Sequence, residues 1–217
     1  MNERLDRPTL VVGIAGGICS GKTSLALALV AALGPTQAVL LSHDAYRRDG
    51  RVVPDGLPAD LLPVVDQARF LEHLGALRLG RPIRPPRGGL HAERLPGDNG
   101  VVVPRPIVVV EGLLLLWDPT ARAALDLTIY LDAPEPVRVA RRLARDGAEP
   151  GATTDALLTQ FSVAARDVHR AYVEPTRAMA DLVLSTAGRL EPLAEIAAAV
   201  VLDRFARRSG EPARRAS

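Results

Sequence analysis

Short apolar runs rich in β-branched residues recur along the chain, and longer segments with helical periodicity separate them. Such runs, when turn residues bound them, are typical of buried strands. Strands that alternate with helices predict a parallel sheet with helices on both faces, which is a three-layer αβα sandwich. The five strands are expected at 10–15, 38–41, 107–110, 127–131 and 182–184, and the helices at 23–33, 66–79, 134–146, 154–172 and 191–206.

One segment, 81–105, interrupts this alternation because it is rich in proline, glycine and arginine. We predict a loop-bearing hairpin there, with 101–103 on one arm. No internal repeat or interdomain linker is visible, so 1–206 is expected to form a single domain, long enough for a substantial buried core. The remaining 207–217 are expected to be a flexible tail.

The composition excludes several classes of protein. A formal net charge of +2 over 217 residues is too small to indicate a nucleic-acid-binding surface. A single cysteine excludes an internal disulfide and a multi-cysteine metal site. Residues 1–8 lack the apolar core of a signal peptide, and the longest purely apolar run, 113–117, is too short to cross a membrane. We therefore expect a soluble, cytoplasmic protein.

The clearest motif follows the first expected strand. The sequence from Gly16 to Thr23 reads GGICSGKT, which fits the phosphate-binding pattern G-x-x-x-x-G-K-[ST]. In such a loop the backbone N–H groups and the N-terminus of the next helix surround the phosphates of a nucleotide. Lys22 is the only lysine among 27 basic side chains, the rest being arginine. A compact ammonium fits between phosphate oxygens where a broad, planar guanidinium does not, which favours phosphate binding by Lys22 over a chance glycine loop.

This motif predicts a nucleoside triphosphate with Mg²⁺ as the bound species; ATP is the expected nucleotide, and the motif leaves the choice between ATP and GTP open. The hydroxyl of Thr23 is expected on Mg²⁺. The expected nucleotide-binding residues are Gly16, Gly17, Ile18, Cys19, Ser20, Gly21, Lys22, Thr23 and Ser24.

Two acids fall directly after expected strands, where ligands bind in open α/β sheets. Glu111 follows an apolar β-forming run. In this position it resembles a Walker-B acid, which holds Mg²⁺ through water. Asp44 follows the second strand, where it could accept the proton of an attacking hydroxyl. Either acid could instead cap a helix or a turn. We predict Thr23 and Glu111 as metal residues, and Lys22 and Asp44 as catalytic residues.

The helix expected at 134–146 carries four arginines. Spacings of three and four residues put Arg138, Arg142 and Arg145 on one face, with Arg141 beside them. Arginines on a closing lid can neutralise the charge of a phosphoryl group in transfer and help to exclude water. A solvated basic face is the alternative, and the spacing alone does not decide between the two.

These motifs together resemble the uridine kinase family, within the uridine kinase/phosphoribulokinase group of P-loop kinases. The similarity runs from about 9 to 184. Residues 13–24 resemble the family's P-loop, and 42–46 (SHDAY) resemble its aspartate–serine–phenylalanine–tyrosine motif. Residues 108–112 (VVVEG) resemble its second acidic strand end, and 141–146 (RRLARD) resemble its lid motif. The resemblance implies the P-loop NTPase form of the αβα sandwich, with a hairpin insertion and a helical lid.

The resemblance also implies roles for individual side chains. It implies that Asp44 is the catalytic base. It also implies that Arg142 and Arg145 are catalytic residues of a lid at about 134–152, and that they do not merely form a solvated basic face. Asp60 matches the ribose-binding acid by its spacing, and Gln160 matches a glutamine that helps to bind nucleotide or nucleoside. The substrate-binding residues implied in this way are Asp44, Tyr46, Asp60, His91, Arg94, Arg142 and Gln160.

Some positions depart from the family pattern. Ala59 replaces the aromatic residue before the ribose-binding acid, and Gly88 and Gly89 stand where a tyrosine packs on a pyrimidine. Pro150 and Ala152 replace two lid cations. The phosphate-binding, base and metal positions are kept, so these departures concern the acceptor more than the reaction.

The sequence therefore predicts an ATP-dependent phosphotransferase that moves the γ-phosphate to a primary hydroxyl of a small molecule. A nucleoside 5′-OH, as in uridine or cytidine, is the expected acceptor. Nicotinamide riboside, a sugar or a pantothenate-like alcohol remain alternatives, as does a nucleotide-binding regulatory protein without transfer activity. The only partner expected is the small-molecule acceptor, with no nucleic acid and no membrane, and the resemblance leaves a homo-oligomer open.

Overall fold

The computed structural model describes residues 9–47, 65–86, 100–146, 163–186 and 189–210. Its centre is a five-stranded sheet in the order β2-β3-β1-β4-β5, and all four strand pairings are parallel. This confirms the predicted fold class. The strands are β1 (Leu10–Gly16), β2 (Ala38–Ser42), β3 (Ile107–Glu111), β4 (Leu127–Asp132) and β5 (Leu182–Ser185).

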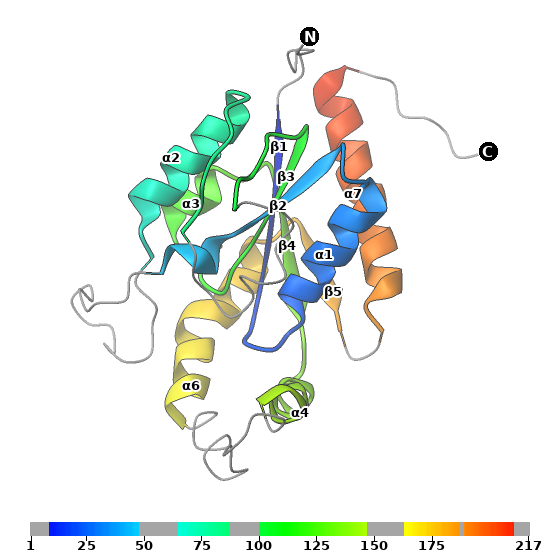
Figure 1. Cartoon of the computed structure of the whole chain (residues 1–217). Helices are drawn as coiled ribbons and strands as arrows, with labels where there is room; N and C mark the ends of the chain where they lie inside the picture. Colours follow the sequence, from blue (N-terminus) through cyan, green and yellow to red (C-terminus); the bar gives the residue numbers. More distant parts are fainter. Residues whose placement is uncertain (1–8, 48–64, 87–99, 147–162, 187–188, 211–217) are drawn as a thin grey trace.

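Helices cover both faces of this sheet (Figure 1). The α-helices are α1 (Lys22–Leu33), α2 (Gln67–Arg78), α3 (Pro119–Ala123), α4 (Glu135–Asp146), α6 (Val163–Val168) and α7 (Glu191–Ser209). Two 3₁₀ segments, η1 (His43–Tyr46) and η4 (Glu174–Met179), and the π-helical turn η3 (His169–Val173) complete the described elements.

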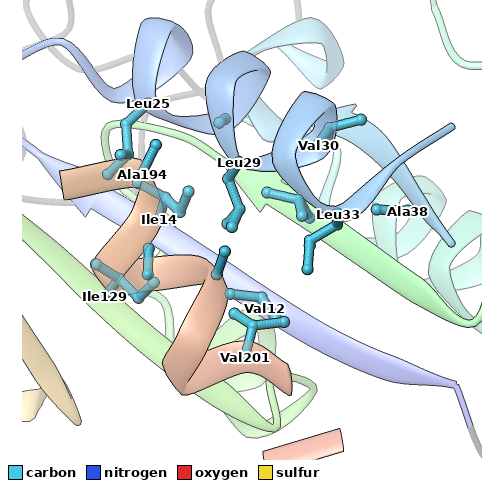
Figure 2. Packing of buried hydrophobic residues seen from close by; sticks show 14 of the residues in the cluster. Val12, Ile14, Leu25, Leu29, Val30, Leu33, Ala38, Ile129, Ala194 and Val201 are labelled. Atoms are coloured by element: carbon cyan, nitrogen blue, oxygen red, sulfur yellow. The ribbon is translucent and has the colours of Figure 1, made fainter. Parts of the chain in front are cut away.

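Alternate residues of the central strand face opposite layers. Val12 and Ile14 pack with Leu25 and Leu29 of α1 and with Ala194 of α7 (Figure 2). On the other face, Val11 packs in a cluster that includes residues of α2 and α3, namely Phe70, Leu74, Leu77 and Ala121. Because both faces of β1 are covered, all seven of its residues are buried, which explains the continuous apolar run in the sequence.

The sheet order brings the loops that carry the predicted site residues to one end of the sheet. β1 lies between β3 and β4, so the chain crosses from one side of β1 to the other after β3. A crevice outside the carboxyl ends of the strands is expected at such a switch point. Figure 1 shows that β1 runs toward the end of the sheet where α4 and α6 lie.

Several helical elements differ from the sequence-based expectation, among them α3, η3 and α7. The short helix α3 was not predicted, because five residues carry too little periodicity. It is capped by the Asp118 side chain, which accepts hydrogen bonds from the backbone N–H groups of Thr120 and Ala121, both at 2.8 Å. The helix expected up to residue 172 ends in the π-helical turn η3. Helix α7 continues to Ser209, so Arg207 and Arg208 are helical rather than part of a flexible tail, and they pair with Asp203 and Asp126.

The hairpin insertion is described only at its base. Ile83 and Val102 form an antiparallel bridge with backbone hydrogen bonds of 3.0 and 2.9 Å, as the predicted arm at 101–103 requires. Two segments lie outside the described residues: the rest of the insertion, at 87–99, and 147–162 of the predicted lid and the helix after it.

Within the described ranges, no helix has the length and apolar character needed to span a bilayer.

Candidate active site

The phosphate-binding motif forms the turn between β1 and α1. Gly21 precedes the helix with φ +101°, a left-handed conformation that a side chain would strain, and α1 begins at Lys22. The Lys22 side chain is 8% exposed, and its ammonium donates a hydrogen bond to the Gly17 carbonyl at 3.1 Å. The ammonium therefore lies against the backbone of the loop that precedes it.

Glu111 is the last residue of β3 and lies next to both neighbouring strands. In the parallel register it lies beside Ile14 of β1 and Ser42 of β2. Its carboxylate accepts one hydrogen bond from the Thr23 hydroxyl at 3.1 Å and another from the Ser42 hydroxyl at 2.6 Å. Burial raises the pKa of Glu111, and the negative charge of Asp44 raises it further, while the charge of Lys22 lowers it. The carboxylate is thus held in a fixed orientation close to a second acid and a cation.

Asp44 lies in η1, immediately after β2. One of its carboxylate oxygens accepts the backbone N–H of Leu113 at 3.2 Å, which anchors the side chain to the segment after β3. Lys22 adjoins Thr23, whose hydroxyl binds Glu111. Leu113, which binds Asp44, lies two residues beyond Glu111. These three predicted site residues, Lys22, Asp44 and Glu111, therefore lie at the same end of the sheet. The strand order accounts for this meeting, since β1, β2 and β3 are adjacent and parallel.

The oxygen donors around Glu111 fit a magnesium ion. Mg²⁺ prefers hard oxygen ligands, and it usually keeps several waters while it binds one or two protein groups and substrate phosphates. The Thr23 hydroxyl and the Glu111 carboxylate supply such oxygens at the start of α1. In the part of the chain that the structure describes, no cluster of three or more acidic, histidine or cysteine side chains forms a metal cage, so a site with few protein ligands is the arrangement available here.

Tyr46, which the sequence suggests as a substrate contact, lies in the core. It is 1% exposed, and its hydroxyl is 2.8 Å from His73 Nδ1. Its ring packs edge-on against Phe70 of α2. Burial raises the pKa of the Tyr46 hydroxyl. We therefore assign Tyr46, the last residue of η1, to the packing of η1 against α2 and do not include it among the substrate contacts proposed below.

The four arginines of α4 do not act as one face. Arg138 is 5% exposed, donates to the Ala133 carbonyl at 3.1 Å and lies against Gly17 of the loop. Arg141 donates to the Ser20 carbonyl at 2.8 Å. Arg142 and Arg145 are half-buried on the same helix. The helix thus contacts the phosphate-binding motif through the two arginines to which the sequence did not assign a function.

Several predicted residues cannot be placed. Asp60, His91, Arg94 and Gln160 lie outside the described residues, and so do the positions that depart from the family pattern, 59, 88–89, 150 and 152. The sequence analysis did not predict a role for Ser42 in the site. Ser42 is the last residue of β2, the strand paired with β3, and it lies two residues before Asp44. Its place at a strand end beside another polar residue is the signal that could have found it.

The close approach of two side chains explains the glycine at position 17. A Cβ there would lie 2.9 Å from His169 Cε1 and 3.0 Å from Arg138 Cδ. We expect Gly17→Ala to destabilise the protein by about 1–3 kcal/mol, the usual effect of overpacking. Gly75→Ala is the matched control, because it lies inside α2 with open space around it and should stabilise by about 0.5–1 kcal/mol. Urea unfolding of both variants measures these opposite signs, and equal stabilities would contradict the packing argument.

His43, next to Asp44, should make stability depend on pH. Its ring is fully buried, and Nε2 lies 3.0 Å from the side-chain oxygen of Gln67. Burial lowers the pKa of His43, so below about pH 6.5 the unfolded chain binds a proton more readily than the folded protein, and stability falls. In His43→Gln the melting temperature should therefore drop less than in the wild type between pH 7.5 and 5. Parallel curves of melting temperature against pH would show that His43 has no such effect.

Comparisons with known proteins agree with this architecture. Residues 71–190 match the model of the "Phosphoribulokinase / Uridine kinase family". A uridine kinase from Chloroflexus aggregans is 31% identical over 194 residues, which cover 83% of this chain and 88% of that protein. A uridine kinase from Geobacillus kaustophilus is 32% identical over 189 residues, which cover 85% of this chain and 90% of that protein.

Solved structures share the fold. A candidate fructose transport system kinase from Silicibacter sp. TM1040 superposes with a TM-score of 0.63 at 24% identity, covering 85% of this chain and 93% of that one. A candidate uridine kinase from Bacillus stearothermophilus superposes with a TM-score of 0.51 at 21% identity, covering 82% and 89%. At these identities, the structural similarity supports the fold.

Proposed function

We propose that this chain, which belongs to the phosphoribulokinase/uridine kinase family and is therefore a kinase, transfers the γ-phosphate of ATP to a nucleoside. The proposed acceptor group is the 5′-hydroxyl of a nucleoside such as uridine or cytidine. The family supports phosphoryl transfer from ATP. The choice of a nucleoside rests on the uridine kinases to which the chain is similar.

The observation that carries the proposal is the hydrogen-bonded position of Glu111. Its carboxylate accepts hydrogen bonds from the hydroxyls of Thr23, which adjoins Lys22, and of Ser42, and Asp44 binds the backbone two residues beyond it, at Leu113. Lys22, Asp44 and the hydroxyls of Thr23 and Ser42 thus lie near the Glu111 carboxylate. Phosphoryl transfer depends mostly on positioning and electrostatic stabilisation, which this cluster is built to supply.

Each residue has a distinct part in the proposed reaction. Lys22 and the loop N–H groups bind the β- and γ-phosphates. Asp44 accepts the proton of the acceptor hydroxyl, whose oxygen bonds to the γ-phosphorus, and the bond from that phosphorus to the β,γ-bridging oxygen breaks so that ADP leaves. Arg142 and Arg145 stabilise the negative charge on the migrating group.

Thr23 and, through water, Glu111 are the residues proposed to hold Mg²⁺. The bound ion would neutralise charge on the β- and γ-phosphate oxygens. Until it binds, the hydrogen bonds from Thr23 and Ser42 keep the Glu111 carboxylate in place.

An acceptor panel tests the proposal. ADP release by the purified protein with ATP and Mg²⁺ is measured with uridine, cytidine, nicotinamide riboside, a hexose and pantothenate. We expect turnover that depends on uridine or cytidine and is absent from Lys22→Ala, a control that excludes a contaminating kinase. Turnover with another acceptor alone would overturn the nucleoside assignment. ATP binding without turnover on any acceptor would favour a regulatory role.

A further inference from the structure

The peptide unit between Ser20 and Gly21 is held from outside the phosphate-binding loop. The Ser20 carbonyl accepts a hydrogen bond from Arg141 Nη1 at 2.8 Å and another from the Thr186 hydroxyl at 3.2 Å. One of these donors comes from α4 and the other from the residue that follows β5. Two donors on one oxygen determine the direction in which that carbonyl points.

The direction of this carbonyl also determines the direction of the Gly21 amide. In a trans peptide the C=O and N–H groups are coplanar and point in opposite directions. Because Arg141 and Thr186 hold the Ser20 oxygen, the Gly21 N–H must point away from them. The positive guanidinium also polarises the peptide unit, which makes the N–H on its opposite side a stronger donor to an anion.

The two donors are themselves immobilised. Arg141 Nη1 donates to the Thr186 hydroxyl at 3.1 Å and Nη2 donates to the Thr186 carbonyl at 3.0 Å. Thr186 is fully buried, and its backbone N–H donates to the carbonyl of Asp132 at the end of β4 at 2.8 Å. The network therefore links the loop to α4 and to the ends of β4 and β5, and it fixes α4, which also carries Arg142 and Arg145, relative to the loop.

We infer that Arg141, supported by Thr186, is a positioning residue of the phosphate site that orients the Ser20–Gly21 peptide for binding of a nucleotide polyphosphate. The inference rests on the proposed function, since it assumes that the loop binds ATP. Arg141 acts through the loop backbone, so its loss should weaken binding of the phosphate groups and leave recognition of the acceptor unchanged.

Binding of inorganic tripolyphosphate and of ATP, with Mg²⁺, tests this inference by calorimetry on the full chain. Arg141→Gln should raise both dissociation constants by about 10- to 100-fold, the range for a lost charge-assisted hydrogen bond. The KM for ATP should rise with them, whereas the KM for the acceptor should not change. Arg141→Lys should recover part of the affinity, because an ammonium can still donate to the Ser20 carbonyl.

A second pair of variants tests the same network if Arg141→Gln does not fold. Thr186→Val keeps the shape of the buried side chain but removes its hydroxyl, and we expect tripolyphosphate affinity to fall several-fold; Thr186→Ser keeps the hydroxyl and should bind like the wild type. Arg207→Gln removes an equal charge from the exposed part of α7 and should leave binding unchanged.

The outcomes separate this inference from the proposed function. A wild-type protein that binds neither tripolyphosphate nor ATP would overturn the proposed function. If the wild type binds and folded Arg141→Gln binds equally well, the positioning role is refuted. If Arg141→Gln does not fold, wild-type affinity in Thr186→Val refutes it.

Discussion

Replacing Asp44 by asparagine is expected to lower kcat about 100-fold or more while the affinity for ATP stays nearly unchanged. Asparagine has almost the same shape, and its amide oxygen can still accept the Leu113 N–H that anchors the side chain. It cannot take up the proton of the acceptor hydroxyl. Because Asp44 is not part of the phosphate-binding loop, the effect should fall on the chemical step.

Steady-state kinetics with the best acceptor and calorimetric ATP binding measure this split. Asp203→Asn, in the C-terminal half of α7, removes an equal charge outside the proposed site and should have wild-type kcat. A kcat within about threefold of the wild type in a folded Asp44→Asn protein would remove Asp44 from the role of catalytic base, because a positioned base contributes at least about 100-fold.

Replacing Lys22 by arginine should be almost as damaging as replacing it by alanine, although both residues carry a positive charge. The ammonium is nearly buried and lies 3.1 Å from the Gly17 carbonyl, against the backbone of the loop that precedes it. A guanidinium is broad, planar and rigid, and it does not fit where a compact ammonium does. We expect kcat to fall about 100- to 1,000-fold, the scale for loss of one electrostatic donor at the reacting group.

The kinetic constants of Lys22→Arg and Lys22→Ala, together with their melting temperatures, provide the measurement. Arg207→Lys is the matched control, because it makes the reverse exchange on an exposed helix surface and should be neutral. Near-normal turnover in Lys22→Arg would mean that any cation suffices, and that the single lysine of this arginine-rich chain has no special role.

The local parts of the candidate site could be predicted from the sequence. The loop from Gly16 to Thr23 carries its signal in consecutive residues, and Glu111 follows directly after an apolar run. Such signals depend on neighbours along the chain. The helix α3 and the π-helical turn η3 were missed because short or irregular elements carry no sustained period.

The arginines of α4 show where this reasoning ends. Helical spacing grouped Arg138, Arg142 and Arg145, but it could not say toward which neighbour the helix turns each side chain. In the structure Arg138 packs against Gly17, and Arg141 reaches Ser20, which is 121 positions away along the chain. The rotation of α4 about its axis depends on what packs against it, and a single sequence does not contain this information.

By itself, the order of residues determined the alternating strands and helices, the glycine loop with its lysine, and the two acids at strand ends, because each depends on a run of adjacent residues. Only the tertiary structure decided that Ser42 and Thr23 share the Glu111 carboxylate, that Tyr46 belongs to the core and that Arg141 holds the loop. These contacts join distant segments, and they exist only because a parallel sheet brings the ends of its strands to one edge.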